Sequence, residues 1–559
     1  MKKETAARCL VRILVENHVE KAFCVPGESY LPVLDALYDA KDRIDLITCR
    51  QESGAGNMAE ASGKLTGRPG ICFVTRGPGA ANAAVAVHTA FQDSTPMILF
   101  IGQVARNHTD REAFQEVDYR QMFGPLAKWV AQIDTGARMA EYVTRAFHVA
   151  LSGRPGPVVL ALPEDMLKDD IPCAGILPAR AAHACISPDD LKTLHDALCA
   201  AKKPLLLLGG SGWDKESVNN VQNFIQKNHL PVAVSFRCQD LVDNRLDNYI
   251  GDVGIGLNPA LANRIKSADL ILCIGPRLGE ITTGGYRLFD IPFPDQKIIM
   301  IHNGAEDSGH VHRPFMAINS SMANIARALC GLPEIPSPSW TADLAAARAS
   351  YLDWNRPLPT VGDVDIGAVY DHLRRDMPDE AILTNGAGNF SIWLHRFMVY
   401  KKYRSQLAPT SGAMGYGLPA AIAAKLTCPD RPVVCFTGDG DFMMTSQEMA
   451  TLSHHGVNII ILLFNNGMYG TIRMHQERHF TGRVIGTDLT NPDFAALARS
   501  FSLHGVTVRK TADFAPAFTQ ALQADKATLI EIMVDAEALT PAATLEQIRT
   551  ATITQQEKS

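Results

Sequence analysis

The feature that most constrains the fold is a pair of polar motifs, each placed directly after a short apolar run. A Gly-Asp-Gly sequence at 438–440 follows the apolar residues 433–436, and Asn-Asn at 465–466 follows the apolar residues 459–464. Short apolar runs that end in turns are typical of strands buried in a parallel sheet. Helical spacing of apolar residues in 446–454 then predicts the order strand, turn, helix, strand.

Asp439 and Asn466 each come just past a predicted strand end. The carboxyl ends of parallel strands meet at one edge of a sheet, so we expect the two side chains to lie close together. One carboxylate, one amide oxygen and a main-chain carbonyl such as that of Met468 suit Mg²⁺, which adds water and phosphate oxygens to complete its shell. Gly438 and Gly440 let the backbone approach an anion. The expected ligand is a metal–diphosphate, although a lone Gly-Asp-Gly is usually only a turn.

Gly-Asp-Gly followed by 24 residues (441–464) and Asn-Asn resembles the thiamine diphosphate (ThDP) motif, and the resemblance extends over nearly the whole chain. The motifs are most similar to those of the acetohydroxyacid (acetolactate) synthases and 2-oxo-acid decarboxylases. The resemblance implies an α/β fold with flavodoxin-like parallel sheets flanked by helices. We expect a pyrimidine-binding domain at 1–170, a central domain at 188–333, a diphosphate-binding domain at 360–540 and a C-terminal tail at 541–559.

Length and composition agree with several globular domains. A chain of 559 residues is too long for one core, and 46% hydrophobic and 20% charged residues are ordinary values. The net charge of −6 gives no support for binding to nucleic acid or membranes, and no apolar run reaches the roughly 18 residues of a membrane span. Twelve cysteines without a C-x-x-C pair, and an N-terminus without a signal-peptide core, favour a cytoplasmic protein with reduced thiols.

Glu52 is the expected catalytic acid of the first domain. It begins the sequence Glu-Ser-Gly-Ala-Gly at 52–56, which follows a predicted strand and opens a Gly/Ala-rich helix. The helix dipole alone favours a glutamate in a first turn by roughly a few tenths of a kcal/mol, whatever its function. The segment resembles the catalytic-glutamate motif of ThDP enzymes, whose carboxyl group shares a proton with N1′ of the aminopyrimidine. The 4′-imino nitrogen can then remove the C2 proton of the thiazolium.

Two further turns of the first domain contain candidate catalytic residues. Glu28 stands in the turn where related decarboxylases have an acidic residue, although a solvated turn carboxylate explains it equally well. Gln115 stands where the decarboxylases have paired histidines, and there the chain resembles the synthases and glyoxylate carboligases. The resemblance implies that Gln115 donates a hydrogen bond to the substrate and that Phe114 shapes its pocket.

The central domain is expected to be mostly scaffold. A glycine-rich turn at 209–212 follows an apolar run, but such a turn alone is weak evidence for a phosphate site. In acetohydroxyacid synthases this domain binds FAD. Residues 276–280 (Pro-Arg-Leu-Gly-Glu) differ from the Arg-Phe-Asp-Asp-Arg segment of those enzymes, so we favour a vestigial domain over one that binds FAD.

The third domain is expected to bind the diphosphate and to bend the cofactor. Residues 410–417 resemble the family segment beneath the two rings, with Met414 as the wedge that presses them together and the Gly412 carbonyl as acceptor for the 4′-amino group. Without this motif, the simplest interpretation of Met414 would be a methionine that packs in the hydrophobic core. The expected metal ligands are Asp439, Asn466 and Met468. The expected cofactor contacts are Pro26, Gly27, Glu52, Thr75, Gly388, Asn389, Phe390, Gly412, Met414, Gly438, Asp439, Gly440, Asp441, Asn466, Met468, Tyr469 and Gly470.

The resemblance implies decarboxylation of a 2-oxo acid such as pyruvate, followed by ligation to a second carbonyl compound. Ligation is preferred to simple release, because Gln115 replaces the decarboxylase histidines and residues 471–475 lack the Glu of simple decarboxylases. These residues also lack the Trp of biosynthetic synthases, so the second substrate stays open. The alternatives are a non-ligating lyase, decarboxylase or C–C hydrolase, which Glu28 favours, and an inactive ThDP-binding scaffold. Family members form homodimers or dimers of dimers in which Glu52 of one subunit would face the diphosphate-binding domain of another.

Overall fold

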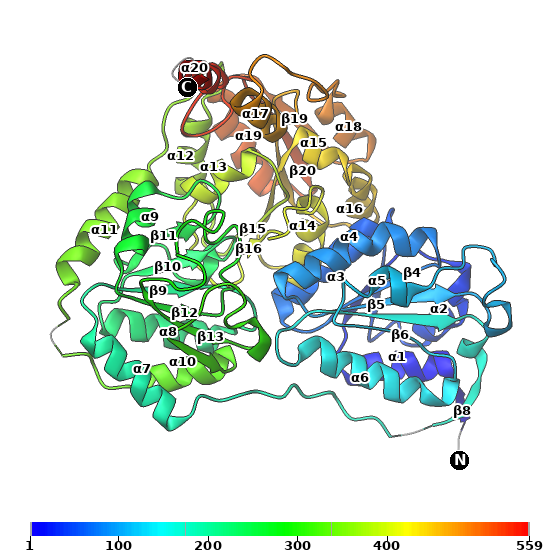
Figure 1. Ribbon diagram of the computed structural model, residues 1–559. Coiled ribbons are helices and arrows are strands. Elements are labelled where there is room, and N and C mark those ends of the chain that lie inside the picture. The colour runs from blue at the N-terminus through cyan, green and yellow to red at the C-terminus, as the bar shows by residue number, and fades with distance from the viewer. Residues whose placement is uncertain (1–2, 174, 337, 557–559) are drawn as a thin grey trace. The chain divides into compact units, whose positions relative to one another are not determined.

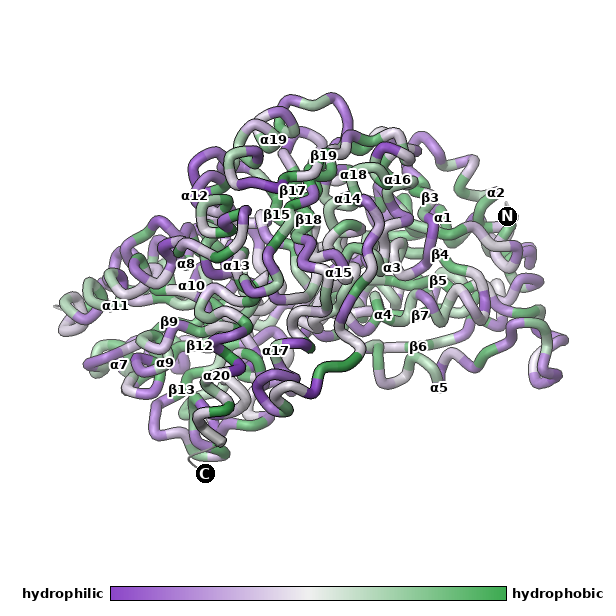
Figure 2. The backbone as a smooth tube through the Cα atoms, turned by 90° about the horizontal axis from the view of Figure 1, so that it is seen from above, coloured by the Kyte–Doolittle hydropathy of each residue, from purple (hydrophilic) through white to green (hydrophobic). Residues whose placement is uncertain are grey.

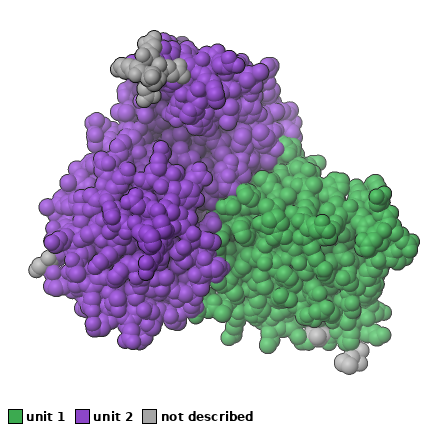
Figure 3. Space-filling view, in the orientation of Figure 1, with its two compact units in different colours: residues 1–183, 422–427, 447–455 green, residues 184–421, 428–446, 456–559 purple. Residues whose placement is uncertain are grey.

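The computed structural model describes residues 3–173, 175–336 and 338–556, and within them it contains three parallel six-stranded sheets flanked by helices (Figure 1). The expected α/β fold class is thereby confirmed. The chain divides into two compact units, which Figure 3 colours separately. The first comprises residues 1–183, 422–427 and 447–455, and the second comprises the remainder. No helix of the described residues has both the length and the apolar character needed to cross a membrane.

The sheet of the first unit has the strand order β3-β2-β4-β5-β7-β6. Helices α1, α2 and α6 share the hydrophobic core on one face, and α3 and α4 pack against each other on the other face (Figure 1). A side chain at Gly56 would bring its Cβ within 2.6 Å of the Ala86 Cβ, so the close packing of α3 and α4 requires glycine there. The strands are β2 (Lys21–Cys24), β3 (Asp45–Thr48), β4 (Gly70–Val74), β5 (Met97–Gln103), β6 (Trp129–Gln132) and β7 (Pro157–Pro163). The helices are α1 (Ala6–Glu16), α2 (Leu31–Asp39), α3 (Glu52–Thr66), α4 (Pro78–Asp93), α5 (Tyr119–Phe123) and α6 (Met139–Leu151).

The central sheet lies in the second unit and has the order β11-β10-β9-β12-β13-β14. Numbered along its own chain segment this is 3-2-1-4-5-6, the order of dinucleotide-binding folds, whereas the other two sheets both follow 2-1-3-4-6-5. The strands are β9 (Pro204–Leu208), β10 (Val232–Ser235), β11 (Tyr249–Val253), β12 (Leu270–Ile274), β13 (Lys297–His302) and β14 (Met316–Asn319). The helices are α7 (Pro188–Ala200), α8 (Lys215–Lys227), α9 (Pro259–Ser267), α10 (Met322–Cys330) and α11 (Thr341–Trp354).

The third sheet, also in the second unit, has the order β16-β15-β17-β18-β20-β19. Strands β15, β17 and β18 appear as largely hydrophobic stretches in Figure 2, as expected for strands covered on both faces. The strands are β15 (Ile382–Asn385), β16 (Gln406–Leu407), β17 (Val433–Gly438), β18 (Ile460–Asn465), β19 (His504–Val508) and β20 (Thr528–Met533). The helices are α12 (Ile366–Asp376), α13 (Phe390–Phe397), α14 (Gly417–Thr427), α15 (Asp439–Met443), α16 (Met449–His455), α17 (Gly470–His479), α18 (Phe494–Ser500), α19 (Thr511–Gln523) and α20 (Leu545–Gln556).

Helix α3 begins at Glu52, which places this residue in the first turn as the sequence indicates. The Gln51 side chain caps the helix by accepting the backbone N–H of Ser53 at 2.6 Å. One local feature was not expected from the sequence. A short antiparallel pair, β1 (Lys3–Thr5) with β8 (Asp170–Pro172), joins two segments far apart in the sequence. Three-residue strands are too short to produce a recognisable alternation of apolar and polar residues.

Candidate functional site

A cavity of about 260 Å³ opens in the second unit at the carboxyl edge of the third sheet. Strands β17 and β18 pair in parallel with Gly438 opposite Phe464, so the turns that follow them lie side by side. Asp439 begins the short helix α15, Asn466 follows β18, and both line the cavity. The structure thus brings together all the expected contacts of this domain: Gly388, Asn389, Phe390, Gly412, Met414, Gly438, Asp439, Gly440, Asp441, Asn466, Met468, Tyr469 and Gly470.

Asp439 is buried and held in place by a small polar network. Its Oδ2 accepts the backbone N–H of Gly467 at 2.9 Å and the Nδ2 amide of Asn491 at 2.7 Å. Asn491 also donates to Oδ1 of Asn465 at 3.0 Å, so one amide ties the ends of both strands together. Burial raises the pKa of Asp439 above its ordinary value. Asn491 did not emerge from the sequence, because it stands alone in a loop segment without a recognisable motif.

Asp441 lines the same cavity, but its carboxylate is bonded to the protein. Oδ1 accepts the backbone N–H of Gly415 at 2.8 Å and of Ala387 at 3.1 Å, and Oδ2 accepts the hydroxyl of Thr437 at 2.7 Å. Burial raises the pKa of Asp441 to about 6, and these donors favour its ionised form. The carboxylate therefore connects three segments of the cavity wall.

The cavity fits a diphosphate with a divalent cation. A Cβ at Gly440 would lie 2.5 Å from the ring of Tyr469, and a Cβ at Gly438 would lie 2.9 Å from the ring of Phe390. Both positions therefore need glycine, because an aromatic ring occupies the space that a side chain would take. Among the described residues, no group of three or more His, Cys, Asp or Glu side chains is placed to hold a metal. A cation beside Asp439 and Asn466 would take further oxygen ligands from a phosphate or water, as Mg²⁺ commonly does.

The C-terminal segment completes one wall of the cavity. Asn389 donates from Nδ2 to the backbone carbonyl of Leu539 at 3.1 Å and accepts the hydroxyl of Thr471 at 2.8 Å. Leu539 itself lines the cavity and packs with Met474. The Asn389 side chain therefore fastens the wall, and Leu539 is a lining residue that the motif analysis missed because it lies beyond the last motif.

In the first unit, the expected residues gather at the carboxyl edge of the sheet. The Oε2 atom of Glu52, at the start of α3, accepts a hydrogen bond from Nδ2 of Asn82 at 2.9 Å. A Cβ at Gly79 would lie 3.3 Å from Oε1 of Glu52, and a Cβ at Gly27 would lie 2.5 Å from Thr75. Gly27 follows Pro26 in the turn after β2, and Thr75 directly follows β4, the neighbour of β2 in the sheet.

Arg76 connects the remaining candidates of the first unit. It forms an ion pair with Glu28 at 3.1 Å, and its guanidinium lies 5.8 Å from the ring centre of Phe114. The Glu28 side chain is 68% exposed, and Phe114 is 71% exposed. Gln115 has a left-handed backbone with φ of 65° and packs against Gly77, the residue after Arg76. Arg76 is a further residue that the sequence did not single out.

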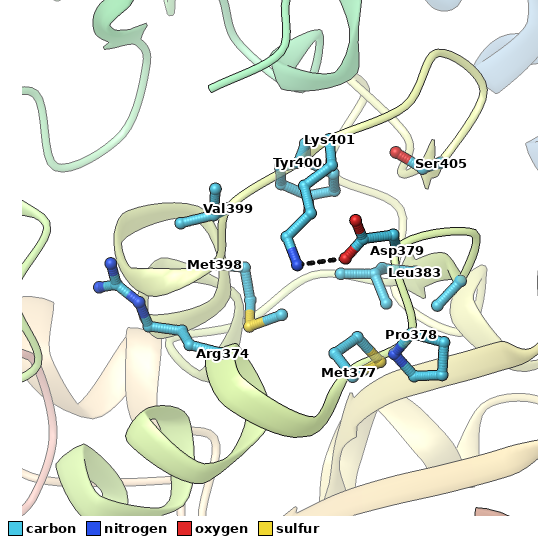
Figure 4. A pocket seen from close by; sticks show the side chains of 11 residues that line it. Arg374, Met377, Pro378, Asp379, Leu383, Met398, Val399, Tyr400, Lys401 and Ser405 are labelled. Carbon is cyan, nitrogen blue, oxygen red and sulfur yellow. Dashed lines mark hydrogen bonds and ion pairs between the residues drawn. The ribbon is translucent and has the colours of Figure 1, made fainter. Parts of the chain in front are cut away.

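A second cavity of about 20 Å³ lies beyond the end of α12, lined by residues outside all of these motifs (Figure 4). There Nζ of Lys401 donates to Oδ1 of Asp379 at 2.5 Å, beside Arg374 and Met398. A space of this size holds about one water molecule, so it is no candidate for a cofactor or substrate site.

The fold and the glycine-lined cavity define an α/β protein of the class that binds phosphorylated ligands at the carboxyl edge of a parallel sheet. Models of known protein families match three parts of the chain, and all three belong to thiamine pyrophosphate (TPP) enzymes. Their N-terminal TPP binding domain matches residues 4–122, their central domain matches 191–329, and their C-terminal TPP binding domain matches 386–532.

Three relatives agree with these matches. The chain is 29% identical to the acetolactate synthase large subunit of Corynebacterium glutamicum, over 96% of this chain and 87% of that protein. It is 29% identical to the isozyme 1 large subunit of acetolactate synthase from Escherichia coli, over 96% and 95%. It is 30% identical to the probable acetolactate synthase large subunit of Methanocaldococcus jannaschii, over 95% and 92%. The chain belongs to the thiamine diphosphate-dependent enzymes, as an acetolactate synthase-like member, and the expected family is confirmed.

Proposed function

We propose that this protein is a ThDP- and Mg²⁺-dependent carboligase that decarboxylates a 2-oxo acid such as pyruvate and joins the remaining unit to a second carbonyl compound. The supporting observation is that Asp439, Asn466 and Met414, which lie far apart in the sequence, line one glycine-rich cavity. The named relatives are acetolactate synthases. When bound, ThDP supplies a nucleophilic carbon for the substrate carbonyl and accepts the electrons left by the departing carboxylate. FAD is not part of the proposal.

Each cavity residue has a distinct role in this proposal. The Asp439 carboxylate, the Asn466 amide oxygen and the Met468 carbonyl would hold Mg²⁺, and the backbone at Gly438 and Gly440 would contact the diphosphate. Asn491 fixes the Asp439 carboxylate through its 2.7 Å hydrogen bond.

The rings of the cofactor would meet the loop that follows β16. Met414 would provide an apolar surface that excludes water from the bound cofactor, and the Gly412 carbonyl would accept a hydrogen bond from the 4′-amino group. Both residues line the same cavity as the metal donors, on the segment that precedes α14.

Glu52 would hold a proton at N1′ of the aminopyrimidine, with Asn82 orienting its carboxylate from 2.9 Å. We propose that two copies of the chain associate and that Glu52 of one copy serves the cofactor of the other. Gln115 and Phe114 would contact the substrate, because both lie beside the Arg76–Gly77 turn at the same sheet edge. Glu28 favours the second candidate, a non-ligating decarboxylase or hydrolase, because related decarboxylases have an acidic residue in this turn, and here the Glu28 carboxylate pairs with Arg76 at 3.1 Å.

Product analysis separates these candidates. The purified protein is incubated with ThDP, Mg²⁺ and pyruvate, and the products are identified by mass spectrometry. Acetolactate or acetoin is expected, whereas acetaldehyde or acetate alone would favour the non-ligating enzyme. A panel of other 2-oxo acids and aldehydes then identifies the preferred donor and acceptor. Bound ThDP without consumption of any 2-oxo acid would instead indicate an inactive scaffold.

A further inference from the structure

Two neighbouring loops contribute to the cavity wall, and both are rich in glycine. Residues 386–389 follow β15 and contribute Gly388, whereas residues 409–415 precede α14 and contribute Gly412 and Met414. Gly388, Gly412 and Gly415 all have positive φ angles, of 151°, 69° and 79°. Glycines gain much conformational freedom when unconstrained, so these loops need other groups to fix their positions.

Arg237 reaches both loops from the central sheet. It follows β10, is 8% exposed, and adopts a left-handed backbone with φ of 61°. Its Nη2 donates to the carbonyl of Gly386 at 2.9 Å, and its Nη1 donates to the carbonyl of Pro409. The guanidinium also lies over the ring of Phe236, 4.8 Å from its centre. One buried cation therefore holds a carbonyl from each loop.

Asp441 holds the same two loops through their N–H groups. Its Oδ1 accepts from Ala387 at 3.1 Å, the residue after Gly386, and from Gly415 at 2.8 Å. Arg237 thus donates to carbonyl groups of the two loops, and Asp441 accepts from N–H groups of the same two loops. Charge-assisted hydrogen bonds of this kind are shorter and stronger than neutral ones.

We infer that Arg237 and Asp441 are positioning residues that set the separation of the two loops before ThDP binds. The inference rests on the proposed function, since the loops matter as the walls of the cofactor site. Asp441 then acts through Ala387 and Gly415, and it need not touch the diphosphate, whose negative charge a carboxylate would repel. A wall that is ordered in advance lowers the entropy lost when the ligand binds.

Matched variants separate positioning from general stability. Arg237→Met is compared with Arg348→Met, because Arg348 also donates to backbone carbonyls, those of Asn244 at 3.0 Å and Tyr249 at 2.8 Å, away from the two loops. Asp441→Asn is compared with Asp269→Asn, because Asp269 also accepts two backbone N–H groups, those of Lys202 at 2.6 Å and Lys203 at 2.9 Å, and it bonds to neither loop. Arg237→Lys retains the charge and serves as a second variant if Arg237→Met does not fold.

The first measurement is the Kd of ThDP in saturating Mg²⁺ by calorimetry, together with the Tm of each variant. Arg237→Met and Asp441→Asn should weaken ThDP binding by roughly 10- to 100-fold, as expected when charge-assisted bonds to the binding loops are lost. Arg348→Met and Asp269→Asn should change the Kd by less than about twofold, whatever their effect on Tm. Equal Kd values in each matched pair would overturn the inference.

The second measurement uses the protein without cofactor, so it remains informative if the proposed function fails. Hydrogen exchange is followed in peptides that contain residues 386–389 and 410–415. Exchange there should be at least about tenfold faster in Arg237→Met, Arg237→Lys and Asp441→Asn than in the two control variants. Unchanged exchange in both loops would reject the positioning role, whereas faster exchange in a protein that never binds ThDP would reject only the proposed cofactor.

Discussion

The carboxylate of Glu448 accepts the backbone N–H of Gln51 at 3.0 Å, although 397 positions separate the two residues. It also accepts the N–H of Arg50 at 3.2 Å and the hydroxyl of Thr451 at 2.5 Å. Glu448 is fully buried, and burial raises its pKa above the ordinary value. These bonds end on the two residues that precede Glu52, so Glu448 fixes the point at which α3 begins.

Replacing Glu448 by alanine should therefore destabilise the protein. The N–H groups of Arg50 and Gln51 would lose a partly buried charged acceptor, and hydrogen bonds to charged groups contribute about 1.5–3 kcal/mol each. We expect the free energy of unfolding to fall by roughly 2–4 kcal/mol, measured by chemical denaturation at neutral pH. Glu448→Gln retains one carbonyl acceptor and should lose less. If the alanine and glutamine variants were as stable as the wild type, the anchoring role would be wrong.

Glu52→Gln should stop turnover while leaving the cofactor bound. A neutral amide can still contact N1′ but cannot share its proton, so the rate of product formation should fall by about 10²- to 10⁴-fold. Calorimetry with ThDP and Mg²⁺ provides the binding measurement. Asn82→Ala removes the donor to Oε2 of Glu52 and should reduce turnover less. Loss of ThDP binding in Glu52→Gln, with turnover preserved in proportion to bound cofactor, would contradict the role.

Much of the fold follows from local sequence patterns, because apolar runs such as 433–436 are short and end in glycine-rich turns. The order of strands within the sheets does not follow from them. The central sheet has a different order from the other two, although its strands are equally apolar and equally spaced by helices. Pairing depends on which distant segments pack together, and that information is spread over the whole core.

Some residues of the site could be predicted from local sequence patterns, whereas others depend on contacts between distant segments. Asp439 and Asn466 could be found because each directly follows a strand, and the geometry of a parallel sheet brings such ends together. Glu448, Arg237 and Asn491 could not, because each acts through a single side chain that bonds to backbone or side-chain groups distant in the sequence. In the sequence, Glu448 is simply a polar residue within the helix predicted at 446–454.

Asp240 and Asp441 should make the protein less stable as the pH rises from about 4 to about 6. Burial raises the pKa of each from the ordinary 3.8 to about 6, so the folded protein binds these protons more tightly than the unfolded chain. Their contribution to stability is therefore fully present below about pH 4 and is lost as the pH rises to about 6. Unfolding of the wild type and of Asp240→Asn should be compared from pH 4 to 7. The stability of the wild type relative to the variant should fall across this range, and a rise would contradict the assignment.

Glu477, which holds helix α20, should contribute stability with the opposite pH dependence. Its buried carboxylate accepts from Arg549 on α20 at 2.8 Å and from Arg473 on α17 at 3.1 Å, and the hydrogen bond from Arg549 is the main reason that its pKa is lowered to about 2. The contribution of Glu477 to the free energy of unfolding is therefore fully present above its ordinary pKa of 4.5, and it is lost as the pH falls toward 2. Glu477→Gln should increase hydrogen exchange in α20 at pH 7. Glu546→Gln, an exposed change on the same helix, should leave it unchanged.

Asn491 offers a test of the metal site that leaves both proposed side-chain ligands in place. Its amide holds Oδ2 of Asp439 and Oδ1 of Asn465, so Asn491→Ala should let the Asp439 carboxylate rotate away from the cation. Loss of such a supporting residue typically costs about 10- to 100-fold in metal affinity. The Mg²⁺ concentration that gives half-maximal ThDP binding should rise by this factor. Asn458→Ala, which removes a hydrogen bond to the Ala524 carbonyl, is the control. An unchanged Mg²⁺ requirement in Asn491→Ala would mean that Asp439 is oriented by Gly467 and the backbone alone.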